Sequence, residues 1–333
     1  MVFWSCQRTR KGGPSVPEVV TIGETMVLFT PEHDGPLRYV HRFAKGIGGA
    51  ESNVCIGLTR LGHSAGWISR VGDDEFGRYV LAQIRGEGVD VSQVRVDPEA
   101  PTAVYFKERR TMGGGAVYYY RRGSAASRLG PGDLDPAYIQ RARVFLGSGI
   151  TPALSPSCRE ALYEGIRLAK EAGALIVFDP NLRLKLWSAD EARSVLRSFV
   201  ALADVVLAGQ DEAEFLTGKN DPVAAGKELL ALGPRQVVVK VGAGGAWVID
   251  AACQVRVPGF RVERVVDPIG AGDAFAAGYI AGLLEGMSPV EAARLGNACG
   301  AFVLGTPGDY EGLPERSEVD AFLADSARPD VRR

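Results

Sequence analysis

Short apolar runs alternate with helical stretches along most of the chain. Runs such as Leu175–Phe178 and Gln236–Val241 are almost continuously apolar, which is typical of strands buried on both faces of a parallel sheet. Stretches such as Ala50–Leu61, Arg159–Ala172 and Ala189–Ala203 read as helices between such strands. This alternation predicts an α/β fold, in which a large domain has a parallel central sheet flanked by helices.

Two stretches break the alternation and predict a second, smaller sheet. Thr102–Gly123 has two β-rich arms around Gly113, Gly114 and Gly115, which indicates a hairpin, and neither it nor Leu28–Lys45 is followed by a crossover helix. We therefore expect a small β-sheet lid over 29–45 and 102–123, standing off a large domain that comprises 18–28, 46–101 and 124–316. A single strand is expected over Val19–Phe29, a disordered tail over 1–17, and a C-terminal helix and tail over 317–333.

Charge and composition exclude several classes of function. The 333 residues carry a net charge of −2 with a sequence pI of about 6.0, so nothing indicates binding to nucleic acid or to an anionic membrane. No apolar run reaches the roughly eighteen residues of a membrane span. The five cysteines are scattered and lack metal-ligand spacing, which indicates a reducing compartment, and we expect a cytoplasmic protein. An anionic substrate would therefore need local positive charge.

The motif most informative about chemistry is Asp-Pro-Ile-Gly-Ala-Gly-Asp at Asp267–Asp273, followed at once by the small, apolar run Ala274–Leu284. A glycine turn that opens a helix points unpaired backbone amides at one place, and the helix dipole adds partial positive charge there. Such a turn suits a phosphate group. Asp273 in the first helical turn is expected to be ionised and able to accept a proton from an attacking hydroxyl. The alternative is a plain helix cap, because Asp and Gly are common at helix N-termini.

A second glycine cluster precedes the first long helix. Gly46, Gly48 and Gly49 come just before Asn53, and the last two glycines would let a ligand approach the backbone closely. Asn53 could hydrogen-bond sugar hydroxyls or brace the loop. A turn with its helix cap is the alternative interpretation.

A third cluster follows a strand in the segment Lys-Val-Gly-Ala-Gly-Gly-Ala-Trp, with Lys240, Gly242 and Gly245 as its main features. It is not a dinucleotide fingerprint, because Trp247 stands at the third glycine position and the next segment is β-like. A strand–loop–strand hairpin is expected, whose loop could lie along ATP phosphates or could be an ordinary hairpin. The phosphate-binding sequence GxxxxGK[ST] is absent, which excludes a P-loop kinase.

Together and in this order, the segments Gly48–Asn53 and Asp267–Asp273 resemble the signatures of the ribokinase family, also called phosphofructokinase-B-type carbohydrate kinases. The resemblance extends from Val19 to Leu313. It implies a large α/β domain, a β lid, MgATP, and transfer of the γ-phosphate to a sugar hydroxyl. By this similarity Asp273 is the catalytic base, and Gly270, Ala271 and Gly272 form the anion hole.

Within this family the chain resembles the 2-keto-3-deoxygluconate kinases, through GETMV, GGAESN, YYR, GSGI and DPNLRLKLW. That resemblance, with the glycine cluster, assigns the sugar acid the following contacts: Gly48, Gly49, Asn53, Tyr105, Tyr119, Arg121, Ile150, Arg183 and Asp273. The substrate carries a carboxylate, onto which an arginine side chain can fork through two hydrogen bonds. Each arginine could instead be a solvated surface charge, and Tyr105 and Tyr119 could be hairpin core residues.

For the nucleotide, the resemblance suggests Lys240, the loop with Gly242 and Gly245, the turn with Gly270 and Gly272, and Asn297. Asn297 could instead satisfy a buried helix. The family often shows Asn-x-x-Glu near the metal; Glu212 matches as a magnesium residue acting through water, but Gly209 stands at the Asn position.

Three alternatives to a sugar-acid kinase stay open at this point. They are a kinase of a neutral sugar such as fructose or ribose, a non-catalytic sugar or nucleotide sensor, and, disfavoured by Trp247, a nicotinamide dehydrogenase. A monovalent cation is a further candidate cofactor, and self-association through the lid is expected.

Overall fold

The computed structural model describes residues 17–110 and 115–326. The tail expected over 1–17 therefore lies outside the described residues except for Pro17. The same holds for the last seven residues of the tail expected at the C-terminus and for Gly113 and Gly114 of the predicted hairpin. None of the helices in the described ranges combines the length and the apolar character that crossing a membrane requires.

The large sheet has nine strands in the order β13-β12-β11-β10-β9-β8-β1-β4-β5. Neighbours from β11 to β5 run parallel, as the sequence predicted, whereas β12 and β13 add an antiparallel edge. The bounds are β1 Val19–Ile22, β4 Ala65–Gly72, β5 Val94–Asp97, β8 Val144–Ser148, β9 Leu175–Asp179, β10 Val205–Gly209, β11 Gln236–Lys240, β12 Ala246–Asp250 and β13 Gln254–Val257.

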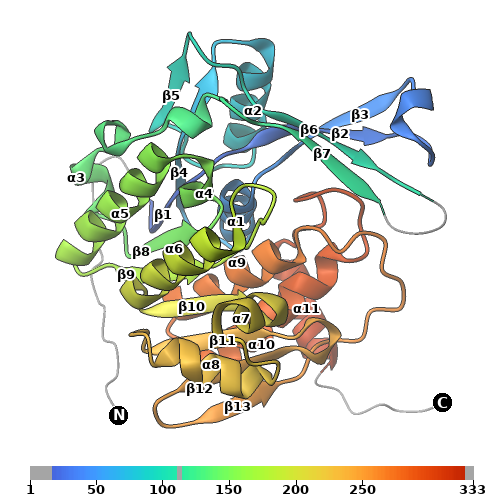
Figure 1. Cartoon of the computed structure of the whole chain (residues 1–333). Helices are drawn as coiled ribbons and strands as arrows, with labels where there is room; N and C mark the ends of the chain where they lie inside the picture. The colour runs from blue at the N-terminus through green and yellow to red at the C-terminus, as the bar shows by residue number, and fades with distance from the viewer. Residues whose placement is uncertain (1–16, 111–114, 327–333) are drawn as a thin grey trace.

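Helices cover both faces of this sheet (Figure 1). On one face lie α1 (Ala50–Arg60), α2 (Glu75–Gly86), α9 (Ala271–Leu284), α10 (Pro289–Val303) and α11 (Arg316–Ser326). On the other lie α3 (Pro136–Ile139), α5 (Pro156–Glu171), α6 (Ala189–Leu202), α7 (Gln210–Thr217) and α8 (Pro222–Leu230). The remaining short helices are α4 (Thr151–Leu154), η1 (Leu37–Tyr39), η2 (Ala126–Arg128), η3 (Pro131–Asp133) and η4 (Gly242–Gly244).

The apolar strands explain this two-sided arrangement. Successive side chains of a strand point to opposite faces, and in β11 Val238 packs into the core on the α9 side while Val237 and Val239 pack on the α8 side. Because each strand buries the side chains on both of its faces, its sequence is continuously apolar rather than alternating.

Helix α9 is largely buried within the large domain, which accounts for its small, apolar sequence. A Cβ on Gly278 or Gly282 would crowd Cys299 or Ala292 of α10, so these glycines allow the two helices to pack closely. An all-round apolar helix is typical of a position inside a core.

The small sheet has the order β3-β2-β6-β7 and extends from the large domain (Figure 1). Its strands are β2 Met26–Pro31, β3 Phe43–Gly48, β6 Val104–Glu108 and β7 Ala116–Tyr120. The antiparallel β6–β7 pair confirms the predicted hairpin arms. The ranges predicted for the lid, 29–45 and 102–123, thus omit the ends of β2 and β3 nearest the large domain.

The single strand expected over Val19–Phe29 is wrong, because the chain leaves the large sheet after Ile22 and enters the small sheet at Met26. Gly23 makes this exit possible, since a Cβ there would overlap the buried carboxyl group of Glu51. Ser69 donates a hydrogen bond of 2.7 Å to the carbonyl of Gly23 and fixes the turn. The sequence pattern did not show that β1 and β2 are separate strands, because both are apolar.

Candidate active site

A cavity of about 680 Å³ lies where the carboxyl ends of β8 to β11 meet the small sheet. Crevices at this end of parallel strands are where α/β folds bind ligands. The predicted site residues that line it are Gly48, Gly49, Asn53, Tyr105, Tyr119, Arg121, Ile150, Arg183, Glu212, Lys240, Gly242, Gly270, Gly272 and Asp273. Ala271, Gly245 and Asn297 are not among the lining residues.

The glycine turn and helix α9 have the predicted geometry. Gly270 caps the helix with a φ of 84°, a left-handed conformation that favours glycine, and a Cβ there would overlap the carbonyl of Asp309. Gly272 is exposed, and a Cβ on it would come no closer than 3.7 Å to another group, the Nζ of Lys240. The backbone at Gly272 is therefore open toward the cavity, as an approaching phosphate would need.

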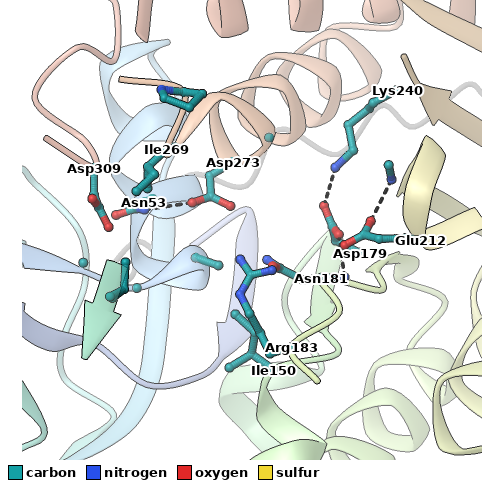
Figure 2. A pocket seen from close by; sticks show the side chains of 18 of the residues that line it. Asn53, Ile150, Asp179, Asn181, Arg183, Glu212, Lys240, Ile269, Asp273 and Asp309 are labelled. Carbon is teal, nitrogen blue, oxygen red and sulfur yellow. Dashed lines mark hydrogen bonds and ion pairs between the residues drawn. The ribbon is translucent and has the colours of Figure 1, made fainter. Parts of the chain in front are cut away.

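Asp273 lies in the first turn of α9 and faces the cavity (Figure 2). Burial raises its pKa to about 7; the hydrogen bond from Asn53 and the charges of Arg183 and Lys240 lower it, and Asp179 raises it. Burial therefore opposes the helix dipole, which was expected from the sequence to keep this carboxyl ionised. A pKa close to the working pH suits a group that must accept and release a proton.

Asn53 braces Asp273 directly. Its Nδ2 donates a hydrogen bond of 2.8 Å to Asp273 Oδ2 (Figure 2). Its Oδ1 is buried and has no hydrogen-bond partner among the described residues. The side chain thus positions the carboxyl group and keeps one acceptor for a ligand hydroxyl.

Gly48 and Gly49 line the cavity, but the protein itself explains why they are glycines. A Cβ on Gly48 would overlap the hydroxyl of Tyr105, and one on Gly49 would crowd the backbone of Glu24 and Thr25. Close packing within the protein, rather than ligand approach alone, therefore requires them.

The two tyrosines of the small sheet differ in environment. Tyr105 is buried and donates a 2.6 Å hydrogen bond to Asp309 Oδ2, in line with the alternative of a core position. Tyr119 stacks on Tyr105 with ring centroids 5.6 Å apart and is 37% exposed. Only Tyr119 presents much of its ring to the cavity.

The two predicted arginines, Arg121 and Arg183, also differ in exposure and in their partners. Arg121 is 9% exposed and places both Nε and Nη2 on Glu24 Oε2, at 2.7 and 2.6 Å. Arg183 is exposed, donates to the carbonyl of Leu182, and has no carboxylate within 4 Å among residues 17–110 and 115–326. Figure 2 shows Arg183 near Asn181, its guanidinium reaching toward the space below Asp273.

Lys240, at the end of β11, is held by the carboxylate of Asp179, at the end of β9. Its Nζ donates to Asp179 Oδ2 at 2.8 Å (Figure 2). Burial lowers the pKa of Lys240, but Asp179 and Glu212 outweigh it, so the pKa lies above its ordinary value. Burial and Asp179 raise the pKa of Glu212.

Both oxygens of Glu212 accept backbone amides, from Leu182 at 2.9 Å and from Gly209 at 2.7 Å. In the part of the chain that the structure describes, no three His, Cys, Asp or Glu residues come together as a metal site. A carboxylate can also act on Mg²⁺ through water, because Mg²⁺ keeps several waters and takes oxygens from phosphates plus one or two carboxylates. Glu212, Asp179 and Asp211 are carboxylates that line the cavity.

The loop between β11 and β12 is the predicted hairpin, yet only part of it faces the cavity. Gly242 lines the cavity, whereas a Cβ on Gly245 would overlap the backbone of Val257, which explains that glycine by packing. Asn297 donates to the carbonyls of Val257 and Pro258, at 3.2 and 3.1 Å. It lies outside the cavity lining and holds the segment after β13, in line with the alternative of a structural role, and a contact with the nucleotide stays a prediction.

Among the polar residues of the lining, sequence reasoning gave no role to Glu24, Asp179, Asn181 and Asp309. Asp179 and Asn181 directly follow a buried strand, which is a usable signal. Asn181 has a φ of 36°, in the left-handed region that is uncommon for residues other than glycine and often marks a functional site. Glu24 and Asp309 carry no such signal, because their partners are distant in sequence.

The chain has close relatives among known proteins. A model of the pfkB family of carbohydrate kinases matches residues 16–316. The chain is 41% identical over 310 residues to the 2-dehydro-3-deoxygluconokinase of Bacillus subtilis (strain 168), covering 92% of this chain and 95% of that protein. It is 38% identical over 322 residues to the 2-dehydro-3-deoxygluconokinase of Thermoproteus tenax, covering 96% and 98%. A probable fructokinase-7 of Arabidopsis thaliana is 36% identical over 318 residues, covering 92% of each chain.

Solved structures share the whole fold. A PfkB protein from Polaromonas sp. JS666 matches with a TM-score of 0.84 and 40% identity, over 92% of this chain and 99% of that one. A putative ribokinase II from E. coli, in complex with ATP and Mg²⁺, matches with a TM-score of 0.86 and 29% identity, over 93% and 99%. The ribokinase-like architecture expected from the sequence is thereby confirmed.

Proposed function

The chain belongs to the pfkB family of carbohydrate kinases, and we propose that it transfers the γ-phosphate of ATP to the 6-hydroxyl of 2-keto-3-deoxygluconate, also called 2-dehydro-3-deoxygluconate. The observation that carries the proposal is the position of Asp273 in the first turn of α9, beside an open glycine turn and inside a cavity of about 680 Å³. The relatives named for this reaction, at 41% and 38% identity, support the choice of substrate.

Asp273 acts as the base. With a pKa raised by burial to about 7, its carboxylate can take the proton of the attacking hydroxyl at neutral pH. Asn53 holds one carboxyl oxygen by its hydrogen bond to Oδ2, which leaves Oδ1 of Asp273 for the sugar.

The backbone amides after Gly270 stabilise negative charge on the phosphoryl group, together with the positive end of the α9 dipole. Lys240 adds a cation close to Gly272. Bound Mg²⁺ would neutralise phosphate charge, held by phosphate oxygens and waters near Glu212 and Asp179.

The carboxylate of the sugar acid is recognised by Arg183, assisted by Tyr119 and Arg121. Arg183 is the stronger candidate because its guanidinium has no carboxylate partner within 4 Å among the described residues, whereas Arg121 already pairs with Glu24. Gly48, Gly49, Asn53, Tyr105 and Ile150 would complete the sugar pocket.

A neutral-sugar kinase is the second candidate. The pairing of Arg121 with Glu24 favours it, because that pairing neutralises one of the two positive charges expected to meet a substrate carboxylate. A monovalent cation, self-association through the small sheet and a cytoplasmic location stay predictions.

A substrate panel at fixed MgATP, with ADP release as the readout, tests the proposal. We expect the largest kcat/KM for 2-keto-3-deoxygluconate, with fructose and ribose at least tenfold lower, in keeping with the weight of one charged hydrogen bond, about 1.5–3 kcal/mol. Asp273→Asn is the matched control that shows turnover to come from this site. A preference for fructose would establish the second candidate, and sugar binding without turnover would indicate a sensor.

A further inference from the structure

Lys107 is a buried cation that the proposed chemistry does not use. It lies on β6 of the small sheet with its side chain only 7% exposed. Its Nζ donates to Asp309 Oδ1 at 2.7 Å and to Asp267 Oδ2 at 3.0 Å. One ammonium group therefore joins the small sheet to two loops of the large domain.

Two carboxyl groups surround the Lys107 ammonium. Burial lowers the pKa of Lys107, but the carboxylates of Asp309 and Asp267 outweigh burial, so its pKa lies above the ordinary value. Removing the ammonium group would leave two carboxylates close together with no counter-charge, which is costly in a buried place. A small monovalent cation is the simplest species that could replace it.

Both aspartates act on the glycine turn. Asp267 begins the turn, and its Oδ1 accepts the amide of Ile269 at 3.0 Å, one residue before Gly270. The carbonyl of Asp309 packs against Gly270 so closely that a Cβ there would overlap it. Tyr105, the neighbour of Lys107 on the same face of β6, donates to the other oxygen of Asp309.

The loop that carries Asp309 lies between α10 and α11, below the small sheet in Figure 1. The glycine turn is thus clamped between this loop and strand β6. No backbone hydrogen bond joins the turn to β6 among the described residues, so the side chains of Lys107 and Tyr105 carry the connection.

We propose that Lys107 is a positioning residue: a built-in monovalent cation that locks the glycine turn to the small sheet, so that the backbone amides reach their working geometry when the sheet is seated over the sugar. The inference rests on the proposed role of the turn in phosphoryl transfer. It does not depend on which sugar is the substrate.

The test compares Lys107→Met with Lys45→Met, which removes an exposed lysine of the same sheet. For Lys107→Met we expect kcat to fall about 10- to 100-fold, as for a catalytic group displaced by about an ångström, while the KM for ATP changes far less. Ammonium or potassium chloride, compared with choline chloride at equal ionic strength, should restore part of that kcat. Lys45→Met should respond no more than wild type, and the response of both should be much smaller than that of Lys107→Met.

A second readout separates this inference from the proposed function, because it needs no turnover. Amide hydrogen exchange of the free protein should become faster in Lys107→Met at residues 267–272 and 305–310, and ammonium should slow it again. If no sugar is phosphorylated but amide exchange becomes faster in Lys107→Met and slower again with ammonium, the proposed function fails. The coupling of the glycine turn to the small sheet through Lys107 is then still supported. Unchanged exchange together with wild-type kcat overturns the coupling.

Two further variants cover the case in which Lys107→Met does not fold. Lys107→Arg retains a cation between the aspartates and should keep most of the activity. Asp267→Asn keeps the Lys107–Asp309 pair but loosens the turn, and it should lower kcat with little change in ATP affinity. Full activity of Asp267→Asn, or a kcat loss in a folded Lys107 variant that no monovalent cation reverses, would overturn the proposal.

Discussion

The two walls of the cavity differ in how their charged groups are satisfied. On the small-sheet side, Arg121 lines the cavity and pairs with Glu24, and Lys107, which is on β6 but not in the cavity lining, pairs with two aspartates. On the wall at the strand ends, Arg183 has no carboxylate within 4 Å among the described residues. Within the same residues, the Asp273 carboxyl group accepts a side-chain hydrogen bond from Asn53 alone.

This difference separates two physical tasks. A buried ion pair fixes the geometry of its two side chains. Removing one side chain of the pair leaves the other charge unpaired in a low-dielectric site. A charge without such a partner is free to act on a ligand. Substitution of Arg121 should therefore change mainly stability, and substitution of Lys107 should displace the glycine turn. Substitutions on the strand-end wall should change turnover and selectivity.

The largest effect is expected at Asp273. Asp273→Asn removes the base but keeps the size of the side chain, so kcat should fall by about 10²–10⁴-fold while sugar binding stays nearly intact. Steady-state kinetics and direct measurement of sugar binding check this. Near-full turnover in the variant would remove Asp273 from the mechanism and with it the contrast between the walls.

Arg121→Met should act mainly on folding. It leaves Glu24 buried without its cation, and breaking such a pair costs about 3–5 kcal/mol of unfolding free energy. Urea unfolding measures the loss, and Arg122→Met, at the exposed neighbouring position, is the control. If Arg121→Met unfolds like wild type and loses only sugar-acid affinity, then Arg121 belongs functionally with Arg183.

Arg183→Ala should act on selectivity. The lost contact to the substrate carboxylate is worth about 1.5–3 kcal/mol, so kcat/KM for the sugar acid should drop by roughly 10- to 150-fold. The drop for fructose should be small, and the urea midpoint should not move. Arg183→Lys keeps the charge without the planar fork and should lie between the two. Equal losses for both sugars would contradict the assignment.

The smallest effect is the pH dependence. Because burial raises the pKa of Asp273 to about 7, the base is protonated below that pH and ionised above it. The kcat/KM should therefore reach half its plateau near pH 7 and fall about tenfold for each further unit of acidity. The residual activity of Asp273→Asn should lack this transition. A flat profile down to pH 5 would mean that the helix dipole keeps the carboxyl ionised, as the sequence had suggested.

The local sequence pattern predicted structure well where a short segment determines its own conformation. The glycine turn before Asp273 and the hairpin around Gly242 could both be predicted, because turn residues and apolar periodicity act over a few residues. The break between β1 and β2 could not, because Glu51 and Ser69, which shape the turn at Gly23, come from elsewhere in the chain.

By itself the sequence determined the α/β class, the family resemblance, and the chemical types gathered at the site, since these are written in residue identity and spacing. Only the tertiary structure decided which charges are free. Arg121 and Arg183 look alike in sequence, but one meets Glu24, 97 positions away, and the other meets no carboxylate within 4 Å among the described residues. Ionisation and pairing depend on burial and on distant partners, and these exist only once the chain has folded.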